Sequence, residues 1–389
     1  MRFVLFVFLM IFSCSIAVAQ EKKKLKDVIT VSGYVKYMNT SSFVSLDSVI
    51  TDNLIHNRIN FKAFLSNRFT AVISMRNRIF YGEATRLNPY LGDMLDADPG
   101  QMDLSFVPVD KKSFVVHSIL DRAYLKYISD KWDVRLGRQR INWGVNLAWN
   151  PNDLFNAYSL IDFDYQERPG ADAVRVQYFP GGLASIDMAY QPGNGLDSSI
   201  VAGMWKFNKW KYDFQLLAGN YYSDLALGAG WAGNVKKAGF KGEATYFQPR
   251  ENISDTSGII SSSITLDYSF KNGLYINASA LYNSGGVDQI SSTANPIQGL
   301  VGVISAKNLM PSKLTYFAQA SGAFNPALNG SLSAFYMQGF NILLVMPSVS
   351  YTMHESWEIM LLGQSYFGEI NSVFKGLGTG IYLRLMYSY

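Results

Sequence analysis

Arginine is the residue type in this sequence whose spacing most clearly suggests a chemical role. Eight arginines of the first half of the chain form the candidate set: Arg58, Arg76, Arg78, Arg122, Arg135, Arg138, Arg140 and Arg175. Fixed positive charges along a wall of low dielectric constant focus the electrostatic potential and can select ions by charge. The alternative is that acidic neighbours such as Asp133 and Asp187 neutralise these charges, so that the side chains only fill space.

Aromatic residues form a second candidate group directly after the densest arginine run. The segment 142–170 contains amide and carboxylate side chains together with six aromatic residues, four of which are the candidates: Trp143, Trp149, Phe155 and Tyr158. A loop surrounded by water has little use for so many apolar rings, because burial stabilises them. We therefore predict that this loop folds inward and narrows the opening of the structure that carries it. The alternative is that the rings form platforms that bind sugars.

No metal site, cofactor or enzyme centre is predicted. The segment 82–117 contains Asp93, Asp96, Asp98 and Asp103 around Gly100, but their spacing differs from that of a calcium-binding EF-hand loop. The histidines are far apart in the sequence, and there is no nucleophile elbow, phosphate loop or zinc motif. A barrel hydrolase would need a serine and a histidine that converge on one wall, and it is kept as a minor alternative.

The elements that position these residues are strands with two different faces. From Val28 onward, segments of about ten residues alternate between apolar and polar positions. Within the segment 259–270, Ile264 and Leu266 share one face, and Ser263 and Thr265 share the other. Because successive side chains of a strand point to opposite faces, one face suits lipid and the other suits water. A closed apolar core would not accept the arginines of the polar face unpaired.

The number of these segments predicts an all-β fold: a single transmembrane antiparallel β-barrel of about 18 strands over residues 28–389. Short turns alternate with long connections, which are expected near 82–117, 142–170, 248–258, 285–297, 325–340 and 369–376. We expect the long connections to be extracellular loops, two of which, 82–117 and 142–170, fold in to narrow the lumen. An even number of strands places both chain ends on the short-turn side.

Arg138 and Arg140 do not fit this alternation. They share the parity of Trp132 and Leu136, which face lipid in the predicted strand. An arginine that faces the middle of a bilayer costs about 2–4 kcal/mol. Because glycine within a strand often marks a β-bulge, we predict a bulge at Gly137 that turns both arginines into the lumen. The other solution is that the strand has reached the rim of the barrel at Arg138.

The start of the chain predicts export. Arg2, an apolar run at 3–12 and a small-residue site at 17–19 have the layout of a signal peptide over residues 1–19. The lysine-rich residues 20–27 are expected to form a periplasmic tail. Cleavage removes Cys14, the only cysteine, and changes the formal charge from +4 to +3 by removing Arg2. That charge is too small to favour nucleic acid as a partner. No later apolar run reaches the length of about 18 residues that suggests a spanning helix.

The arginine-rich strand and the loop after it resemble a known family. The run Arg135-Leu-Gly-Arg-Gln-Arg-Ile-Asn-Trp-Gly144, followed by Asn150-Pro-Asn-Asp153 and Arg168-Pro-Gly170, is similar to porin-like outer-membrane proteins with an R-x-G-R-Q-x-x-x-W-G core and a downstream N-P-x-D. A more distant resemblance is to the alginate-export type of 18-stranded barrel. The specific match covers residues 132–170. It implies a channel with an arginine-lined lumen and transfers that role to Arg135, Arg138 and Arg140, without implying alginate as the solute.

Together these features predict a passive channel for small hydrophilic or anionic solutes in the outer membrane of a Gram-negative bacterium. The main alternative is a plugged surface barrel that binds glycans or assembles capsule, and a barrel lipase is a more remote one. The expected partners are outer-membrane lipid, small solutes and the barrel-assembly machinery. That machinery would recognise the last strand, 377–389, which ends on an aromatic residue.

Overall fold

The computed structural model describes residues 28–389 except 99, 163, 165–167, 169, 252, 254–255, 290–303 and 371. The predicted signal peptide and periplasmic tail lie outside the described residues. The strands are β1 (Ile29–Phe43), β2 (Val49–Phe64), β3 (Phe69–Gly82), β4 (Ser105–Lys111), β5 (Phe114–Ile128), β6 (Trp132–Gln139), β7 (Ala171–Gly181), β8 (Ala184–Gln191), β9 (Ile200–Lys209), β10 (Tyr212–Tyr221), β11 (Asp224–Val235), β12 (Ala238–Pro249), β13 (Ile259–Ser269), β14 (Tyr275–Asn283), β15 (Leu314–Ala323), β16 (Leu328–Met337), β17 (Ile342–His354), β18 (Trp357–Ile370) and β19 (Val373–Ser388). The described helices are all short: α3 (Glu83–Leu87), α4 (Leu91–Asp96), η1 (Leu196–Ser198) and η3 (Gln338–Phe340).

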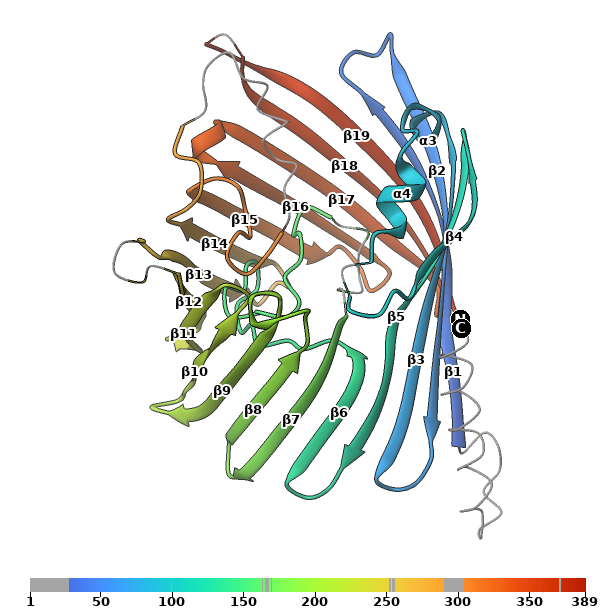
Figure 1. Ribbon diagram of the computed structural model, residues 1–389. Helices are drawn as coiled ribbons and strands as arrows, with labels where there is room; N and C mark the ends of the chain where they lie inside the picture. Colours follow the sequence, from blue (N-terminus) through green and yellow to red (C-terminus); the bar gives the residue numbers. More distant parts are fainter. Residues whose placement is uncertain are drawn as a thin grey trace.

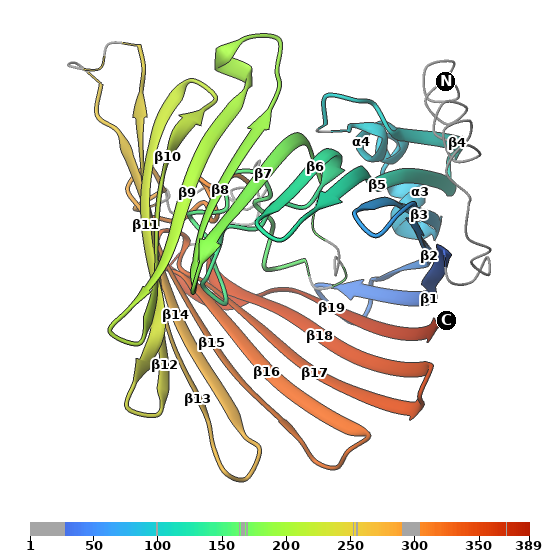
Figure 2. The same cartoon turned by 90° about the horizontal axis from the view of Figure 1, so that it is seen from below.

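These strands form one antiparallel sheet that closes on itself (Figures 1 and 2). Consecutive strands are paired, and the sheet closes where β1 pairs with β19, with Tyr34 opposite Ser388. Because β3 pairs directly with β5, β4 is an addition to the edge of β5 and is not part of the ring. Nineteen strands less β4 leave 18 in the barrel. The prediction of a single antiparallel barrel of this size is confirmed.

The two faces of the barrel differ in the way that the alternation predicts. On β13, Ile264 and Leu266 are 42% and 51% exposed on the outward face, whereas Ser263 and Thr265 are buried on the inward face. The same division recurs around the ring, with exposed apolar side chains outward and polar side chains inward. Among the described residues, no helix is long and apolar enough to cross a bilayer.

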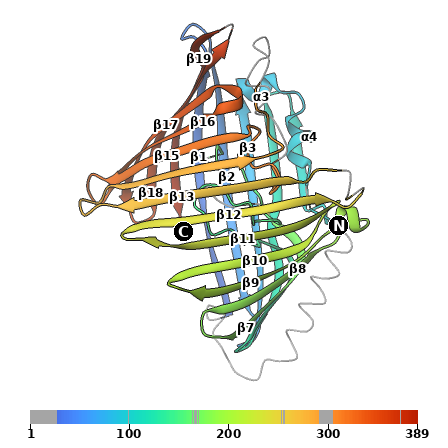
Figure 3. The ribbon, with the colours of Figure 1, turned by 90° about the vertical axis from the view of Figure 1, so that its left-hand side faces the viewer.

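Long connections, such as the one that holds α3 and α4, lie at one end of the barrel, and the C-terminus lies at the other (Figure 3). The described structure has long connections after β3, β6, β12 and β14, close to four of the predicted places. The predicted loops at 325–340 and 369–376 are wrong, because β16 occupies most of the first and β18 and β19 fill most of the second. Their alternation is interrupted by glycine and polar residues, and pairing with neighbouring strands keeps them extended.

Candidate functional site

The connection between β6 and β7 crosses the inside of the barrel (Figure 1). Its described residues within 140–170 are called the strap here. Trp143 and Trp149 of the strap are 0% and 1% exposed. The Trp149 ring packs edge-on between Phe317 of β15 and Phe335 of β16, at 6.3 Å from each ring centre. A sugar would need an exposed ring face, and neither tryptophan offers one.

The two other aromatic residues of the candidate set are also engaged. Phe155 packs edge-on against Trp143, with ring centres 5.1 Å apart. The Tyr158 hydroxyl donates to the carbonyl of Ala148 (3.3 Å), and the Arg168 guanidinium lies 3.1 Å from the centre of the Tyr158 ring. The rings of the strap therefore serve as its internal core and its contact with the wall.

Glu243 of β12 binds the first half of the strap. Its carboxylate accepts the backbone N–H groups of Val145, Asn146 (2.8 Å) and Asn152 (3.0 Å). Thr245, two residues along the same inward face, donates to the side-chain oxygen of Asn152 (2.7 Å). Carboxylates that accept several N–H groups form strong, charge-assisted bonds, so one buried side chain fixes the path of the strap along this wall.

Asp164 binds the second half of the strap to the seam where β1 pairs with β19. Its carboxylate lies 2.7 Å from Lys36 Nζ of β1 and 3.9 Å from Arg384 Nη1 of β19. His56 Nδ1 of β2 lies 3.9 Å away. Burial acts to raise the pKa of Asp164, but the neighbouring His56 side chain and the charge of Lys36 lower it below its ordinary value. The strap is therefore attached to β12 through Glu243 and to the seam between β1 and β19 through Asp164.

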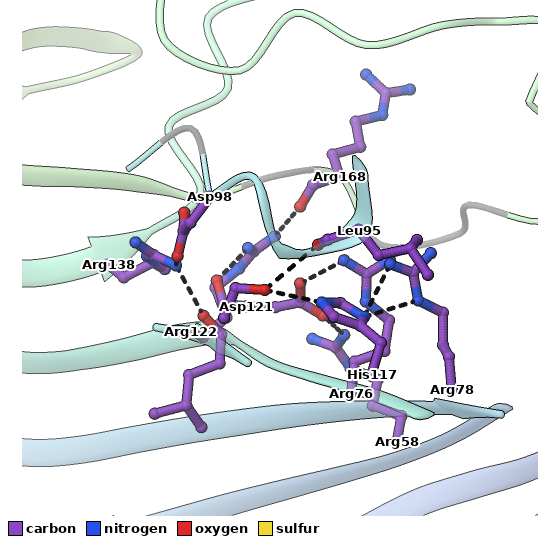
Figure 4. Close-up of polar contacts among 12 residues, drawn as sticks. Arg58, Arg76, Arg78, Leu95, Asp98, His117, Asp121, Arg122, Arg138 and Arg168 are labelled. Atoms are coloured by element: carbon purple, nitrogen blue, oxygen red, sulfur yellow. Dashed lines mark hydrogen bonds and ion pairs between the residues drawn. The ribbon is translucent and has the colours of Figure 1, made fainter. Parts of the chain in front are cut away.

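Three arginines of the candidate set, Arg58, Arg76 and Arg78, lie close together on one wall of the barrel (Figure 4). Asp121 of β5 pairs with Arg58 of β2 (2.5 Å) and with Arg76 of β3 (2.9 Å), and all three side chains are buried. Arg78 donates to Nδ1 of His117 at 3.0 Å. One carboxylate thus holds two guanidinium groups, an arrangement in which removal of the acid leaves two buried charges.

Ser105 and His117 converge on the same wall, as a barrel hydrolase would require. Ser105 Oγ lies 2.8 Å from His117 Nε2. However, Arg78 can only donate to Nδ1, because a guanidinium has no acceptor. Nε2 must then carry the proton and donate to Ser105, which itself donates to the carbonyl of Leu95 (3.3 Å). In this tautomer the imidazole cannot take the proton of the serine, so the pair holds α4 against β5 and is not a nucleophile with its base.

The predicted bulge at Gly137 is wrong. Both ladders of β6 run without a register shift, with Gly137 opposite Tyr124 and Ala173. Gly137 instead has a positive φ of 115°, which a residue with a side chain rarely adopts. A register shift lies instead in β5, the strand beside β6, where Asp121 is skipped in the pairing of β3 with β5. Gln139, expected to turn outward, is fully buried.

Arg138 nevertheless avoids lipid, for a different reason. Its guanidinium binds Asp172 of β7 (2.8 Å) and Asp98 of the β3–β5 connection (2.7 Å), and it donates to the carbonyl of Met102 (2.5 Å). The side chain is 2% exposed because the segment around Gly100 covers it. Of the two solutions considered, the one in which β6 reaches the rim at Arg138 is nearer to the structure.

Arg122, Arg135, Arg140 and Lys62 are among the residues that line a cavity of about 330 Å³ inside the barrel. A second cavity of about 590 Å³ lies toward the turn between β2 and β3 and is lined by Lys62, Lys126 and Arg135. Asp133 pairs with Arg135 (2.9 Å) and Lys126 (3.1 Å).

The remaining contacts differ between these arginines. Arg122 donates to two carbonyls, those of Asp121 and Arg168, both at 2.6 Å. Arg140 donates to the side chain of Asn142 (3.3 Å), and its buried Nε has no hydrogen-bond partner among the described residues. Arg175 lies apart from both cavities and is paired with Asp187.

Sequence reasoning missed the acids that organise the interior: Asp121, Asp164 and Glu243. Glu243 was detectable as the one carboxylate among the inward residues of β12. The partners of Asp121 and Asp164 depend on strand register and loop path, which the sequence pattern does not define. Among the described residues, no group of three or more histidine, cysteine, aspartate or glutamate side chains is placed to hold a metal ion.

The fold is that of a porin barrel. Pseudomonas aeruginosa OccK8 (OprE) superposes with a TM-score of 0.57 at 9% identity, covering 93% of this chain and 98% of that one. Acinetobacter baumannii OccAB1 gives 0.55 at 10% identity, with 95% and 98% covered. The outer membrane protein opdK of P. aeruginosa gives 0.56 at 9%, with 92% and 99% covered. No family model and no curated protein matches the sequence.

Proposed function

We propose that the protein is a porin-like channel of the outer membrane that passes small hydrophilic solutes and prefers anions. The observation that carries the proposal is the closed barrel with an apolar outward face and, inside it, cavities lined by lysine and arginine. An apolar outward surface suits the hydrocarbon of a bilayer. Closure of the ring leaves none of its strands with an unpaired edge in that hydrocarbon. The similarity in fold to outer-membrane porins supports this reading.

The charge balance of the two cavities supports the preference for anions. Their lining includes five cations, Lys62, Arg122, Lys126, Arg135 and Arg140. Asp133 pairs with two of them, Arg135 and Lys126. Fixed charge of one sign in a narrow space raises the local concentration of counter-ions.

The strap supports a limit on solute size. It is attached to β12 through Glu243 and to the seam between β1 and β19 through Asp164. A segment attached at both sides narrows the cross-section that a solute can use. We infer that the free space lies on the side of β2, β3, β5 and β6, where both cavities are found.

Planar-bilayer recording tests this function. The purified barrel is expected to give discrete conductance steps and an anion-selective reversal potential in a salt gradient. Arg135→Ala and Arg140→Ala should each move that potential toward zero. Lys271→Ala is the matched control, because Lys271 is exposed in the turn after β13 and lines neither cavity. A folded barrel without conductance would contradict the proposal and favour a plugged barrel.

A further inference from the structure

Four asparagines stand on the outward face of three neighbouring strands: Asn39 of β1, Asn53 and Asn57 of β2, and Asn77 of β3. They alternate with inward residues such as Arg58 and Arg76. No other described strand has an asparagine or glutamine at the middle of its outward face. Elsewhere around the barrel the corresponding positions are mostly apolar and exposed, as at Leu227 (60%), Leu266 (51%) and Leu332 (53%).

Hydrogen bonds connect these amides across the strands. Asn77 Nδ2 donates to Asn57 Oδ1 (3.2 Å), and Asn77 Oδ1 accepts from Ser118 Oγ of β5 (2.7 Å). Asn53 Oδ1 accepts from the Tyr37 hydroxyl (2.7 Å) and from Asn39 Nδ2 (3.1 Å). We call this surface the amide strip and define it by its members: Tyr37, Asn39, Asn53, Asn57, Asn77 and Ser118. It runs over β1, β2, β3 and β5, which lie side by side in Figure 1.

The amide strip has hydrogen-bonding capacity that the described chain does not use. Asn77 keeps one N–H, and Asn39 keeps its side-chain carbonyl oxygen, once the contacts of the described residues are counted. Both side chains are partly exposed. These two groups therefore have no hydrogen-bond partner among the residues that the structure describes.

One row of the strip lies between two apolar rows of the outward face. Strand register places Asn57, Asn77 and Ser118 in one row across three strands. The neighbouring outward row on one side consists of Ile55, Ile79 and Val116. The neighbouring outward row on the other side consists of Ile59, Met75 and Leu120, so both are apolar. Hydrocarbon offers no hydrogen bonds, so a spare amide group facing lipid is unfavourable.

We propose that the amide strip is an interface that binds a second copy of this chain within the membrane. The inference rests on the proposed membrane location. An amide both donates and accepts, so a row of amides complements another copy of itself. No charged side chain lies on the outward face of β1, β2 or β3, so the surface does not call for an acidic or basic partner. Exposed Val35 (41%) and Ile59 (40%) beside the strip supply apolar contact area.

Thiol cross-linking in outer membranes tests the interface directly. Single-cysteine variants Val35→Cys and Ile59→Cys place a thiol beside the strip, in a Cys14→Ser background so that no other thiol is present. With a short bismaleimide, both should give a product of twice the chain mass. Leu227→Cys on the outward face of β11 is the control and should stay monomeric. No product from either strip variant, equal product from Leu227→Cys, or a product with a different polypeptide would each overturn the proposal.

Substitution of the amides tests whether they cause the association. Asn57→Leu combined with Asn77→Leu should raise the dissociation constant about tenfold, a size expected for a few hydrogen bonds between membrane-embedded surfaces. Native mass spectrometry in detergent measures it, and heat-modifiable mobility shows that the variant barrel is folded. Unchanged association of the folded variant would overturn the role of the strip. Conductance is measured on the same samples, so a failure of this interface is distinguishable from a failure of the proposed channel.

Discussion

Replacement of Glu243 provides the sharpest test of how the strap is held. The carboxylate is 1% exposed and accepts three backbone N–H groups of the strap. Val145 and Asn146 share Oε1, whereas Asn152 uses Oε2. Glu243→Gln keeps one carbonyl oxygen and loses the charge and one acceptor. Glu243→Leu removes every acceptor while keeping a side chain of similar size.

The size of the effect follows from the number of bonds. A hydrogen bond to a charged group contributes roughly 1.5–3 kcal/mol, and each 1.4 kcal/mol corresponds to about a tenfold change in an equilibrium constant. Loss of the Asn152 bond in Glu243→Gln should therefore raise local opening of the strap by about ten- to a hundredfold. Glu243→Leu should raise it by roughly a thousandfold or more. The buried Trp149 and the Asn146 bond to Ser263 (2.6 Å) still hold the strap near the wall.

Hydrogen–deuterium exchange of peptides that span 143–155 measures this opening in folded barrels. Glu369→Gln is the matched control, because Glu369 is an exposed carboxylate at the rim that accepts from Asn341 (2.5 Å). Exchange should rise in the order wild type, Glu243→Gln, Glu243→Leu, with the control unchanged. If Glu243→Leu left these amides as protected as in the wild type, the strap would be held by its packing and not by the carboxylate.

Two further predictions concern buried acids. Asp121→Asn removes the carboxylate that Arg58 and Arg76 share, so it should lower the free energy of unfolding by about 3–5 kcal/mol. Urea titration in lipid vesicles measures this change. Exposed Asp96→Asn is the control, and an equal loss of stability in both variants would contradict the reasoning. Burial raises the pKa of Asp153 in the strap from 3.8 to about 6, so its protonation stabilises the folded strap fully below about pH 4. That contribution is lost as the pH rises through about 6. Amide exchange at Trp143 should increase over this range, and Asp153→Asn should abolish the dependence.

The fold was predictable because the bilayer imposes its pattern on every strand. Ile264 and Leu266 face outward and Ser263 and Thr265 face inward because a closed barrel separates lipid from water. The strand count followed from that repeated pattern. The alternation fails where glycine and small polar residues interrupt it, as in β16, and there only pairing with β15 and β17 defines the strand. This is why the predicted loop at 325–340 was wrong.

The candidate site was predictable only in part. Parity along a single strand predicts which arginines face inward. The acid that pairs with each arginine depends on the register between strands. Asp121 pairs with Arg58 and Arg76 because the shift in β5 brings its carboxylate between them. Arg138 shows the same limit, since its partner Asp98 lies 40 residues earlier in a connection that no strand pattern places.

The positions of the strap and of the cavities together define how the interior of the proposed channel would be used. Trp143 packs in a buried cluster with residues of β7 to β12, and Trp149 packs in one with residues of β14 to β19, so the inward faces of those strands are covered. The cavities lie against β2, β3, β5 and β6, where Lys62, Arg122 and Arg135 are found. By covering β7 to β12 and β14 to β19, the strap would direct a solute toward the wall that carries the cations. In this arrangement the strap would shape selectivity both by covering those strands and by supplying Arg140 to the cavity lining. Release of Glu243 would then weaken anion preference as it widened the path.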